Sequence, residues 1–336
     1  MKSYHINAGA GINALTIKEH DIKEPGFNEV LVKVKATSLN YRELMIIEDG
    51  KYPLPVKPDV VPVADGAGEV VAVGNGVTRF KTGDRVTGIV FPEWVDGPFL
   101  WEYSQQLGGS LDGMLAEYVL MPEHWLLHIP QHLSWEEAAT LPCAGVTAWN
   151  ALNGARPVLP GENVLALGSG GVSLFAMQLA KLSGARVIAT TSSDEKAEKL
   201  RALGADEVIN YNTTPDWHLA VKQLTGGHGA DHIIEVGGPG TMERSMQSLS
   251  VGGEISMIGW LAGGSSTIDL NAFNGTVGNL RRIALGSRAH HIAMNRAIQV
   301  NGLKPVIDKV FHFNEAKEAL HYLAAGRYFG KVVIVH

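Results

Sequence analysis

Disulfide bonds cannot hold this protein together, because its 336 residues include a single cysteine, Cys143. So little cysteine is typical of a reducing compartment, and we expect a cytoplasmic protein. Basic residues are not in excess either: the net charge is −6, so nucleic acid is not an expected partner. No apolar run is long enough to cross a bilayer and the N-terminus has no signal-peptide pattern, so a membrane is not an expected partner.

A chain of this length favours two domains, and the part up to about residue 122 reads as mostly β-structure. Segments of strand length occur at Val30–Lys35, Glu69–Val73 and Glu117–Leu120, with glycine turns between them. Many short strands with glycine turns predict a compact β-barrel or sandwich. Residues 91–112 show no clear period, and a loop of that length is typical of a lid or a binding loop.

A glycine turn between a strand and a helix is the strongest local signal. The apolar run Asn163–Leu167 precedes Gly168, Gly170 and Gly171, and apolar residues then follow at helical spacing from Val172. A second strand is expected at Arg186–Thr190. Such a turn lets a phosphate approach the bare backbone and meet the helix N-terminus, although the third glycine position holds Ser173. The alternative is an ordinary tight turn without a ligand.

The end of the second strand lacks the acid that usually holds the ribose of NAD. Thr190, Thr191, Ser192 and Ser193 stand there instead, and Lys196 follows. Hydroxyl groups and a lysine suit a 2′-phosphate, so we expect NADP(H) rather than NAD. The alternative is that Ser193 caps the next helix and Lys196 is a surface charge, and both interpretations can hold together.

Strands and helices alternate through the rest of this region, which predicts a doubly wound parallel sheet of six strands. Gly237 and Gly259 each follow a strand, at the edge where ligands bind in such sheets. The last segments are a helix that Asn314 caps and a strand, Lys331–Val335. The other expected elements are strands near Glu207–Ile209, His232–Val236, Glu254–Ile258 and Arg282–Gly286, and helices near Pro215–Thr225 and Thr241–Ser250.

From Glu24 onward the chain resembles the medium-chain dehydrogenase/reductase superfamily. The residues that carry the resemblance are Gly66–Gly74, Gly83-Asp84-Arg85-Val86, Gly168–Val172 and Gly204–Tyr211. The resemblance implies an α/β protein with a GroES-like β-barrel domain (1–125 and 286–336) and a Rossmann domain (126–285). It also implies that the cofactor lies in the cleft between the two domains.

The zinc ligands of that superfamily are missing. Where zinc-using members have a Cys-His pair this chain has Asn40-Tyr41, and where they have Gly-His-Glu it has Val63-Ala64-Asp65. Only the later cysteine remains, as Cys143, and the loop Phe91–Gly113 has no cysteine for a structural zinc. One thiol without a histidine cannot make the usual catalytic site, so we expect no metal.

Asn40-Tyr41-Arg42 resembles the zinc-free branch of quinone oxidoreductases and enone reductases, although Glu43 stands where aspartate is commoner. The resemblance implies hydride transfer from NADPH to a quinone or to the activated C=C bond of an α,β-unsaturated carbonyl compound. Asn40 and Tyr41 would line the nicotinamide end, and Tyr41 or Tyr52 would donate a hydrogen bond to the developing enolate oxygen. For both tyrosines the alternative role is packing.

The cofactor-binding set expected from the motifs and the resemblance has fifteen members, and Phe329 would help to close over the cofactor. Trp94, Phe99, Trp101 and Trp260 would form an apolar substrate pocket or, alternatively, the core of a loop. The strand near Ile283–Gly286 resembles an edge strand that pairs across a two-fold axis, so a homodimer is expected. The fifteen residues are Gly168, Ser169, Gly170, Gly171, Val172, Thr191, Ser192, Ser193, Lys196, Tyr211, Gly237, Gly259, Leu261, Gly330 and Lys331.

Two other functions fit the same sequence. One is an NADP-dependent alcohol dehydrogenase or aldehyde reductase that works without zinc. The other is a non-catalytic NADPH-binding sensor, which would hold the cofactor and reduce no electrophile. The sequence does not identify the small-molecule substrate, because the loops around 91–112 and 260–275 determine the pocket and have no derivable conformation.

Overall fold

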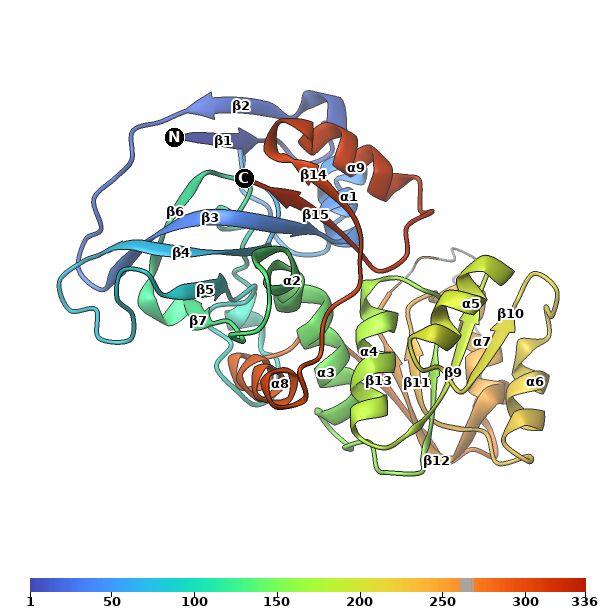
Figure 1. The fold of residues 1–336 in the computed structure, drawn as a ribbon. Helices are drawn as coiled ribbons and strands as arrows, with labels where there is room; N and C mark the ends of the chain where they lie inside the picture. Colours follow the sequence, from blue (N-terminus) through green and yellow to red (C-terminus); the bar gives the residue numbers. More distant parts are fainter. Residues whose placement is uncertain (260, 262–266, 268) are drawn as a thin grey trace. The chain divides into compact units, whose positions relative to one another are not determined.

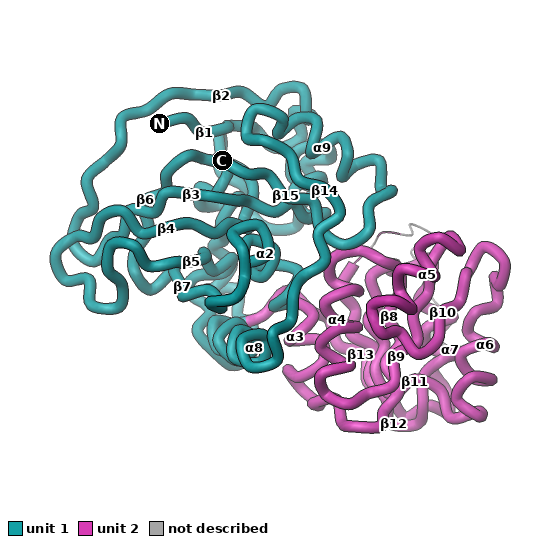
Figure 2. Tube along the Cα trace, viewed as in Figure 1, with its two compact units in different colours: residues 1–146, 287–336 teal, residues 147–286 magenta. Residues whose placement is uncertain are grey.

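The computed structural model describes residues 1–259, 261, 267 and 269–336. Its chain, drawn in Figure 1, divides into two compact units, which Figure 2 distinguishes by colour. The first unit comprises residues 1–146 and 287–336, and the second comprises residues 147–286. The domain limits expected from the sequence, at 125/126 and 285/286, stay a prediction. None of the described helices is long and apolar enough to span a membrane.

The first unit is built around β3 (Glu29–Leu39), a strand of 11 residues whose valines at 30, 32 and 34 are buried. β3 pairs antiparallel with β4, β6 and β15, so it lies at the centre of the sheet. The other strands of the unit are β1 (Lys2–His5), β2 (Thr16–Glu19), β4 (Asp65–Val73), β5 (Arg85–Gly88), β6 (Tyr118–Pro122), β7 (Leu126–His128), β14 (Ile307–His312) and β15 (Lys331–Val335).

The register of these strands brings three distant segments together at the end of β3. Val332 of β15 lies opposite Leu39, so Lys331 comes next to Asn40. On the other side of β3, Asp65 of β4 lies opposite Ser38. The chain then leaves the sheet through α1 (Tyr41–Leu44) and a π-helical turn, Met45–Asp49.

Three further α-helices and a second π-helical turn belong to the described part of the first unit. α2 begins after Ser134, whose hydroxyl accepts a hydrogen bond from the backbone N–H of Glu137 at 3.2 Å. A π-helical turn carries Cys143 toward the end of the unit. The segments are α2 (Trp135–Ala139), the turn Leu141–Gly145, α8 (Arg288–Asn301) and α9 (Ala316–Ala324).

The predicted cap of the last helix at Asn314 is wrong. A 3₁₀ turn, Phe313–Glu315, precedes α9, and the carboxylate of Glu315 accepts a hydrogen bond from the backbone N–H of His312 at 2.7 Å. Asn314 thus lies inside this turn, and Glu315 is the residue that directly precedes α9, so Asn314 is not at the N-cap position.

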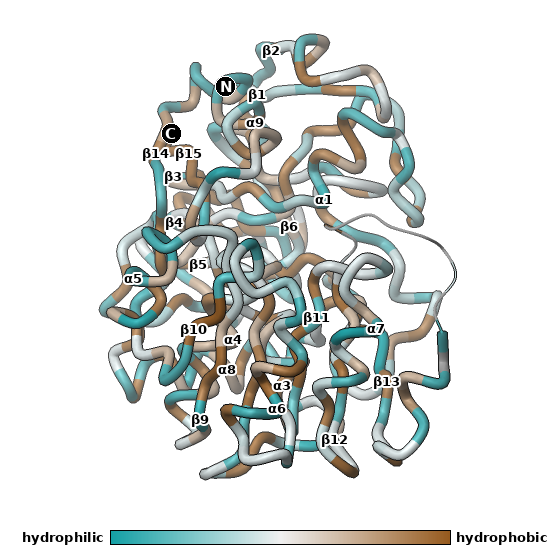
Figure 3. Tube along the Cα trace, turned by 90° about the vertical axis from the view of Figure 1, so that its right-hand side faces the viewer, coloured by the Kyte–Doolittle hydropathy of each residue, from teal (hydrophilic) through white to brown (hydrophobic). Residues whose placement is uncertain are grey.

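The second unit confirms the predicted doubly wound parallel sheet of six strands. Its order is β10-β9-β8-β11-β12-β13, and every neighbouring pair is parallel. Val164 and Leu165 are fully buried, which explains why β8 reads as a continuous apolar run. In Figure 3, brown apolar segments recur along the strands, whereas many connecting loops are teal and polar. The strands are β8 (Asn163–Ala166), β9 (Arg186–Thr191), β10 (Glu207–Asn210), β11 (Ala230–Glu235), β12 (Leu249–Met257) and β13 (Asn279–Arg282).

The predicted strand Arg282–Gly286 is wrong in position, because β13 pairs with β12 over Asn279–Arg282 and ends there. It is nevertheless the edge strand of the sheet. The connecting helices lie close to their expected places, since the apolar spacing that predicted them is also the spacing that they bury. They are α3 (Val146–Asn153), α4 (Gly171–Leu182), α5 (Asp194–Ala202), α6 (Trp217–Leu224) and α7 (Pro239–Ser248).

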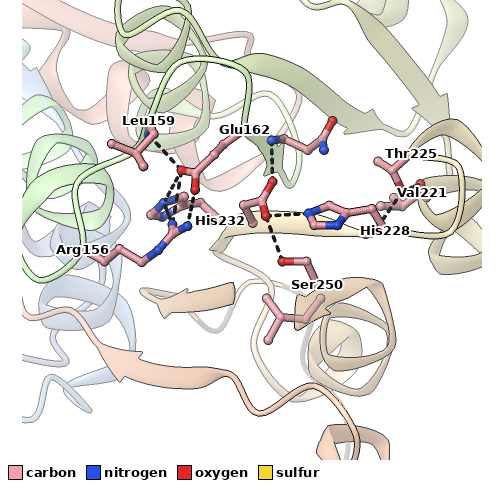
Figure 4. Close-up of polar contacts among 12 residues, drawn as sticks. Arg156, Leu159, Glu162, Val221, Thr225, His228, His232 and Ser250 are labelled. Carbon is pink, nitrogen blue, oxygen red and sulfur yellow. Dashed lines mark hydrogen bonds and ion pairs between the residues drawn. The ribbon is translucent and has the colours of Figure 1, made fainter. Parts of the chain in front are cut away.

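Buried carboxylates join the starts of three of these strands (Figure 4). Asp231 of β11 accepts hydrogen bonds from the backbone N–H of Asn163 at 2.8 Å, from Ser250 at 3.0 Å and from His228 at 2.8 Å. Beside it, Glu162 pairs with Arg156 and accepts the backbone N–H of Leu159 at 2.8 Å. This edge of the sheet is the one opposite the ends where ligands bind, so we assign it a structural role.

We expect Asp231→Ala to lower the free energy of unfolding by about 3 kcal/mol, since it leaves three donors without their charged acceptor. Urea denaturation followed by circular dichroism measures this. Glu198→Ala is the control, because Glu198 is exposed within α5 and its loss should change stability by less than about 0.5 kcal/mol. Equal effects of the two substitutions would contradict the assignment.

Candidate functional site

The glycine turn of the second unit has the geometry of a phosphate cradle. Gly168 has φ +74°, which favours glycine, and a Cβ added at Gly168 or Gly170 would meet open space. Gly170 is the N-cap of α4, and in the described part of the chain no side chain caps that helix. The free N–H groups and the helix dipole therefore face a space that an anion can fill.

Ser173, at the third glycine position, has a definite structural role. It is buried, and its hydroxyl donates a hydrogen bond to the carbonyl of Leu167 at 2.6 Å. This hydrogen bond links the first turn of α4 to the end of β8. In the usual motif a glycine stands at the position of Ser173, because the helix packs closely on the strand there. The departure from the glycine pattern therefore leaves the turn intact.

The end of β9 presents hydroxyl groups without a carboxylate among them. The hydroxyl of Thr190 accepts the backbone N–H of Gly168 at 3.2 Å, and Thr191 is buried. Ser193 accepts the backbone N–H of Lys196 at 3.3 Å, so its expected capping role is present. The side chains of Ser192 and Lys196 are only half-buried.

The acid nearest in sequence, Asp194, is turned toward β10. Its carboxylate accepts a hydrogen bond from Asn210 at 2.8 Å, and Asn212 donates to the carbonyl of Ser192 at 2.7 Å. Tyr211, which lies between these two asparagines in sequence, is exposed. The residues predicted to hold the adenosine phosphate thus gather on β9, the start of α5 and the turn after β10, all within the second unit.

Glu235, at the end of β11, is a functional candidate that the sequence patterns did not indicate. Its buried carboxylate accepts hydrogen bonds from the backbone N–H groups of Gly237 at 2.7 Å and Gly238 at 3.0 Å, and from the hydroxyls of Thr241 and Ser245. Burial raises the pKa of Glu235, and these donors oppose that rise. Glu235 thereby binds the N–H groups of the two residues that precede α7.

Gly259 approaches the neighbouring strand closely, since a Cβ there would lie 2.4 Å from the carbonyl oxygen of Val236. Leu261 is exposed, and Trp260 lies outside the described residues. Two other predicted cofactor contacts, Gly330 and Lys331, belong to the first unit, where Gly330 has φ +93°.

In the first unit, Asn40 lies in a buried polar cluster at the end of β3. Its amide oxygen accepts a hydrogen bond from the ammonium of Lys331 at 2.5 Å, and its amide nitrogen donates to Asp65 at 2.9 Å. Lys331 also donates to the carbonyl of Leu39 at 2.6 Å and lies 3.7 Å from Asp65. The amide of Asn40 is therefore fixed from both sides, and both of its polar atoms are in use.

Glu43 connects this cluster to a second set of buried groups. It accepts the backbone N–H of Asn40 at 2.7 Å and pairs with Arg42 at 3.0 Å. Arg42 donates to Gln106 at 2.9 Å and to the hydroxyl of Tyr52 at 3.4 Å. Asn-x-x-Glu is a capping pattern, so the sequence held a signal for Glu43, whereas nothing in it indicated Gln106.

Burial changes the acidity of two members of the cluster. It raises the pKa of the Asp65 carboxyl from its ordinary value of 3.8 to about 7, while Lys331 and Asn40 oppose the rise. It also raises the pKa of the Cys143 thiol, which is further raised by Asp65 and Glu43. Among the described residues, one oxygen of Asp65, Oδ1, has no hydrogen-bond partner. The first unit thus contains a carboxyl whose pKa is raised to about 7 and a thiol whose pKa is raised as well.

The three predicted catalytic residues differ in their surroundings. The hydroxyl of Tyr52 donates to Gln106 at 2.9 Å, so it already has an internal partner. Tyr41 is 42% exposed, which leaves its side chain the most accessible of the three. The structure brings Asn40 and Tyr41 together at the start of α1, and their catalytic roles stay predictions.

The aromatic residues of the loop 91–112 pack against one another. Phe99 makes edge contacts with Trp94 at 5.1 Å and Trp101 at 6.3 Å between ring centroids. Trp94 is buried and also contacts the ring of His290. This arrangement corresponds to the alternative of a loop core, while Trp101, 75% exposed, remains accessible for a substrate.

A doubly wound parallel sheet with an open glycine turn, joined in one chain to a barrel unit, is the domain combination of alcohol dehydrogenases and related reductases. Comparisons with known families agree. Residues 26–131 match the family model described as alcohol dehydrogenase GroES-like domain, and residues 171–300 match the one described as zinc-binding dehydrogenase. The chain belongs to the medium-chain dehydrogenase/reductase superfamily and is an oxidoreductase of that superfamily.

Curated relatives carry two kinds of name. A zinc-type alcohol dehydrogenase-like protein of Schizosaccharomyces pombe is 45% identical over 97% of this chain and 96% of its own length. A quinone oxidoreductase of Pseudomonas aeruginosa is 31% identical over 99% of each chain.

The similar solved structures also include both alcohol dehydrogenases and a reductase of an unsaturated substrate. A putative alcohol dehydrogenase from Sinorhizobium meliloti superposes with a TM-score of 0.92 at 39% identity, covering 100% of this chain and 99% of that one. An NAD-dependent alcohol dehydrogenase gives 0.90 at 35% identity, with 100% of both chains covered. A 2-octenoyl-CoA carboxylase reductase in complex with NADP and 2-octenoyl-CoA gives 0.87 at 26% identity, covering 99% of this chain and 87% of that one.

The residues of this chain do not fit the zinc that one of these family descriptions implies. The three expected ligand positions hold the amide of Asn40, the methyl group of Ala64 and the neutral thiol of Cys143. The amide oxygen already accepts a hydrogen bond from Lys331. A catalytic zinc needs at least three good protein ligands. Within the described residues no group of three or more His, Cys, Asp or Glu side chains is placed to hold a metal ion, and the absence of metal stays a prediction.

We expect Asp65→Asn to change the pH dependence of stability. Because burial raises the pKa of Asp65 to about 7, the native state keeps a proton that the unfolded chain releases near pH 4. Asp65 therefore stabilises the native state fully below about pH 4, and this contribution is lost as the pH rises to about 7. Between these pH values the free energy of unfolding falls by up to about 1.4 kcal/mol per pH unit. Urea denaturation between these pH values should give a flatter curve for Asp65→Asn than for the unaltered protein. Parallel curves would place the pKa of Asp65 near its ordinary value.

Proposed function

We propose that this protein is an NADPH-dependent reductase that transfers a hydride to a quinone or to the activated C=C bond of an α,β-unsaturated carbonyl compound, without zinc. The observation that carries the proposal is the buried cluster at the end of β3. Its amide and charged groups pair with one another, and its donor set does not fit zinc. The relatives named quinone oxidoreductase, and the solved reductase that holds an enoyl-CoA, support this substrate class.

The second unit supports the choice of NADPH. Gly168, Gly170 and the start of α4 suit a pyrophosphate, because they combine an uncrowded backbone with free N–H groups. Ser192 and Lys196 suit a 2′-phosphate, and Asp194 is held away from them by Asn210. When bound, NADPH would supply the hydride, which is the difficult chemical step.

Without a metal, the substrate itself must accept the electrons that the hydride brings. Quinones and α,β-unsaturated carbonyl compounds do so, because the charge moves to a carbonyl oxygen remote from the carbon that is attacked. The hydroxyl of Tyr41, which is exposed, would donate a hydrogen bond to that oxygen. Asn40 would line the nicotinamide end through its fixed side chain rather than as a free donor. Tyr52 would support the site through Gln106.

The dimer and the location of the protein remain proposals of the same kind. β13 is the edge strand of its sheet, and the exposed side chain of Leu280 on it supports a homodimer through this edge. A cytoplasmic location is supported by the single cysteine.

We expect the kcat/KM for NADPH to exceed that for NADH by at least about tenfold, with a quinone or an enone as acceptor. Ser192→Asp should reverse this preference, because a carboxylate at the end of β9 repels a 2′-phosphate and accepts from a ribose hydroxyl. Ser192→Ala is the matched control and should keep the preference for NADPH. Turnover of a simple aldehyde alone would favour an alcohol dehydrogenase, and cofactor binding without any turnover would favour a sensor.

We expect Tyr41→Phe to lower kcat/KM for an enone by about 100-fold, because one donor to the developing oxyanion is lost. The dissociation constant for NADPH, measured by fluorescence, should stay the same. Tyr118→Phe, on β6, removes a hydroxyl elsewhere in the same unit and should leave both quantities unaltered. If Tyr41→Phe retains full kcat/KM, Tyr41 has only a packing role.

A further inference from the structure

Two histidine rings meet on one face of the two-stranded sheet of β1 and β2, which lie side by side in Figure 1. His5 is the last residue of β1, and His20 directly follows β2. The strands are antiparallel with Ser3 opposite Lys18, and side chains alternate between the two faces of a sheet. His5 and His20 therefore share one face with these two residues, and the Nε2 atoms of the two histidines lie 3.2 Å apart.

Hydrogen bonds decide which nitrogen of His5 keeps a free lone pair. Its Nδ1 lies 3.0 Å from the backbone carbonyl oxygen of Asp59 and 3.4 Å from the carboxylate of the same residue. Both of these oxygens accept hydrogen bonds, so Nδ1 carries the ring proton and Nε2 carries the lone pair. That lone pair faces the hydroxyl of Ser3 at 2.9 Å and the ring of His20. His5 is thus held in the tautomer that a metal ligand needs.

Asp59, on the other side of the His5 ring, is itself held in place. Its φ is +52°, a left-handed conformation that a residue other than glycine keeps only with support from its surroundings. Its backbone N–H donates to Asn7 at 2.8 Å, and its carboxylate accepts a hydrogen bond from Lys18 at 2.5 Å. Outer partners of this kind, a carbonyl and a carboxylate on the second ring nitrogen, fix the orientation of histidines that bind metal ions.

The separation of the two Nε2 atoms fits a shared metal ion. Metal–imidazole bonds of about 2.0–2.1 Å at tetrahedral angles place two ligand nitrogens about 3.3 Å apart. His20 is exposed and lines a surface hollow together with Glu19 and Asp21, so its ring can turn toward an ion and water can complete the coordination. Because Lys18 pairs with the carboxylate of Asp59, the ligands on offer are imidazoles, which favour zinc, copper or nickel over magnesium or calcium.

We propose that His5 and His20 bind one divalent transition-metal ion, with water as the remaining ligands, and that this ion links β2 to β1. β1 is anchored to the rest of the unit, since the backbone N–H of Tyr4 donates to the carbonyl of Leu115 at 3.0 Å. β2 gains more from the link, because all four of its residues are exposed and a two-stranded sheet alone is only marginally stable. The site shares no residue with the cluster around Asn40, so it is separate from the zinc position considered there and does not depend on which electrophile is reduced.

Zinc titration of the purified full-length protein, free of any affinity tag, tests the site. Isothermal titration calorimetry should show one zinc ion bound per chain, and magnesium should give no binding heat. His20→Ala should weaken zinc binding at least about tenfold, because one of the two side-chain ligands is lost. His124→Ala is the matched control: it removes another exposed histidine of the first unit and should leave zinc binding unaltered. Copper(II) in place of zinc should give an electron paramagnetic resonance spectrum with coupling to two imidazole rings.

Hydrogen exchange followed by mass spectrometry tests the link between the strands. At a zinc concentration of about 100 times Kd, the amides of β2 should exchange up to about 100-fold more slowly, because openings that separate β2 from β1 must release the ion. In His20→Ala, zinc should leave the exchange of β2 unaltered. Because His20 is exposed, this variant is expected to fold, which circular dichroism checks. His20→Gln, which keeps a polar side chain, provides the same comparison if His20→Ala does not fold.

The proposal is overturned if the folded unaltered protein binds no zinc, or if a folded variant without His20 binds zinc as tightly as the unaltered protein does. It is also overturned if zinc slows the exchange of β2 equally in that variant, or if the copper spectrum shows a single imidazole. None of these measurements requires turnover. A failure of the proposed reductase function would appear instead as an absence of NADPH oxidation with every quinone and enone, and would leave the zinc result unaffected.

Discussion

The interaction on which the first unit depends is the amide of Asn40, held between the ammonium of Lys331 and the carboxylate of Asp65. These three residues come from β15, β4 and the end of β3, and only the strand register brings them together. A polar group buried in this way costs free energy unless each atom has a partner. The pairing therefore limits which residues can stand at 40, 65 and 331, and it constrains how the chain can leave β3 into α1.

The two units differ in whether their polar groups are available to a ligand. In the second unit the backbone at Gly168 and Gly170 is left open, and the start of α4 keeps its N–H groups available. Before α7, the carboxylate of Glu235 accepts hydrogen bonds from the N–H groups of Gly237 and Gly238, so a side chain of the protein already binds the backbone there. In the first unit, by contrast, the charges are matched internally. An open cradle in one unit and a closed network in the other is the arrangement expected when a cofactor supplies the chemistry and the protein supplies orientation.

Sequence patterns predicted the features that depend on local spacing. The glycine turn, the alternation of strands and helices and the missing acid after β9 all follow from residues close together in the chain, and the sheet order confirmed the fold. Contacts between residues far apart in the chain could not be predicted from local sequence patterns. The contact of Lys331 with Asn40 requires knowledge that β15 pairs with β3, and the role of Gln106 requires the fold of a loop without periodicity. Even the local prediction at Asn314 was wrong, because Asn314 lies inside a 3₁₀ turn that precedes α9.

The division of the chain also has a consequence for synthesis on the ribosome. The second unit is continuous in sequence, from residue 147 to 286, so it can fold as soon as that stretch has emerged. The first unit is interrupted, and its central strand waits for β15, the last strand to be made. Until then, Asn40 and Asp65 lack their cation, and residues 36–39 of β3 lack the strand that pairs with them on one side. The barrel is thus begun first and completed last, and this unpaired part of β3 is open to chaperones or to aggregation for the whole time that the second unit takes to be translated.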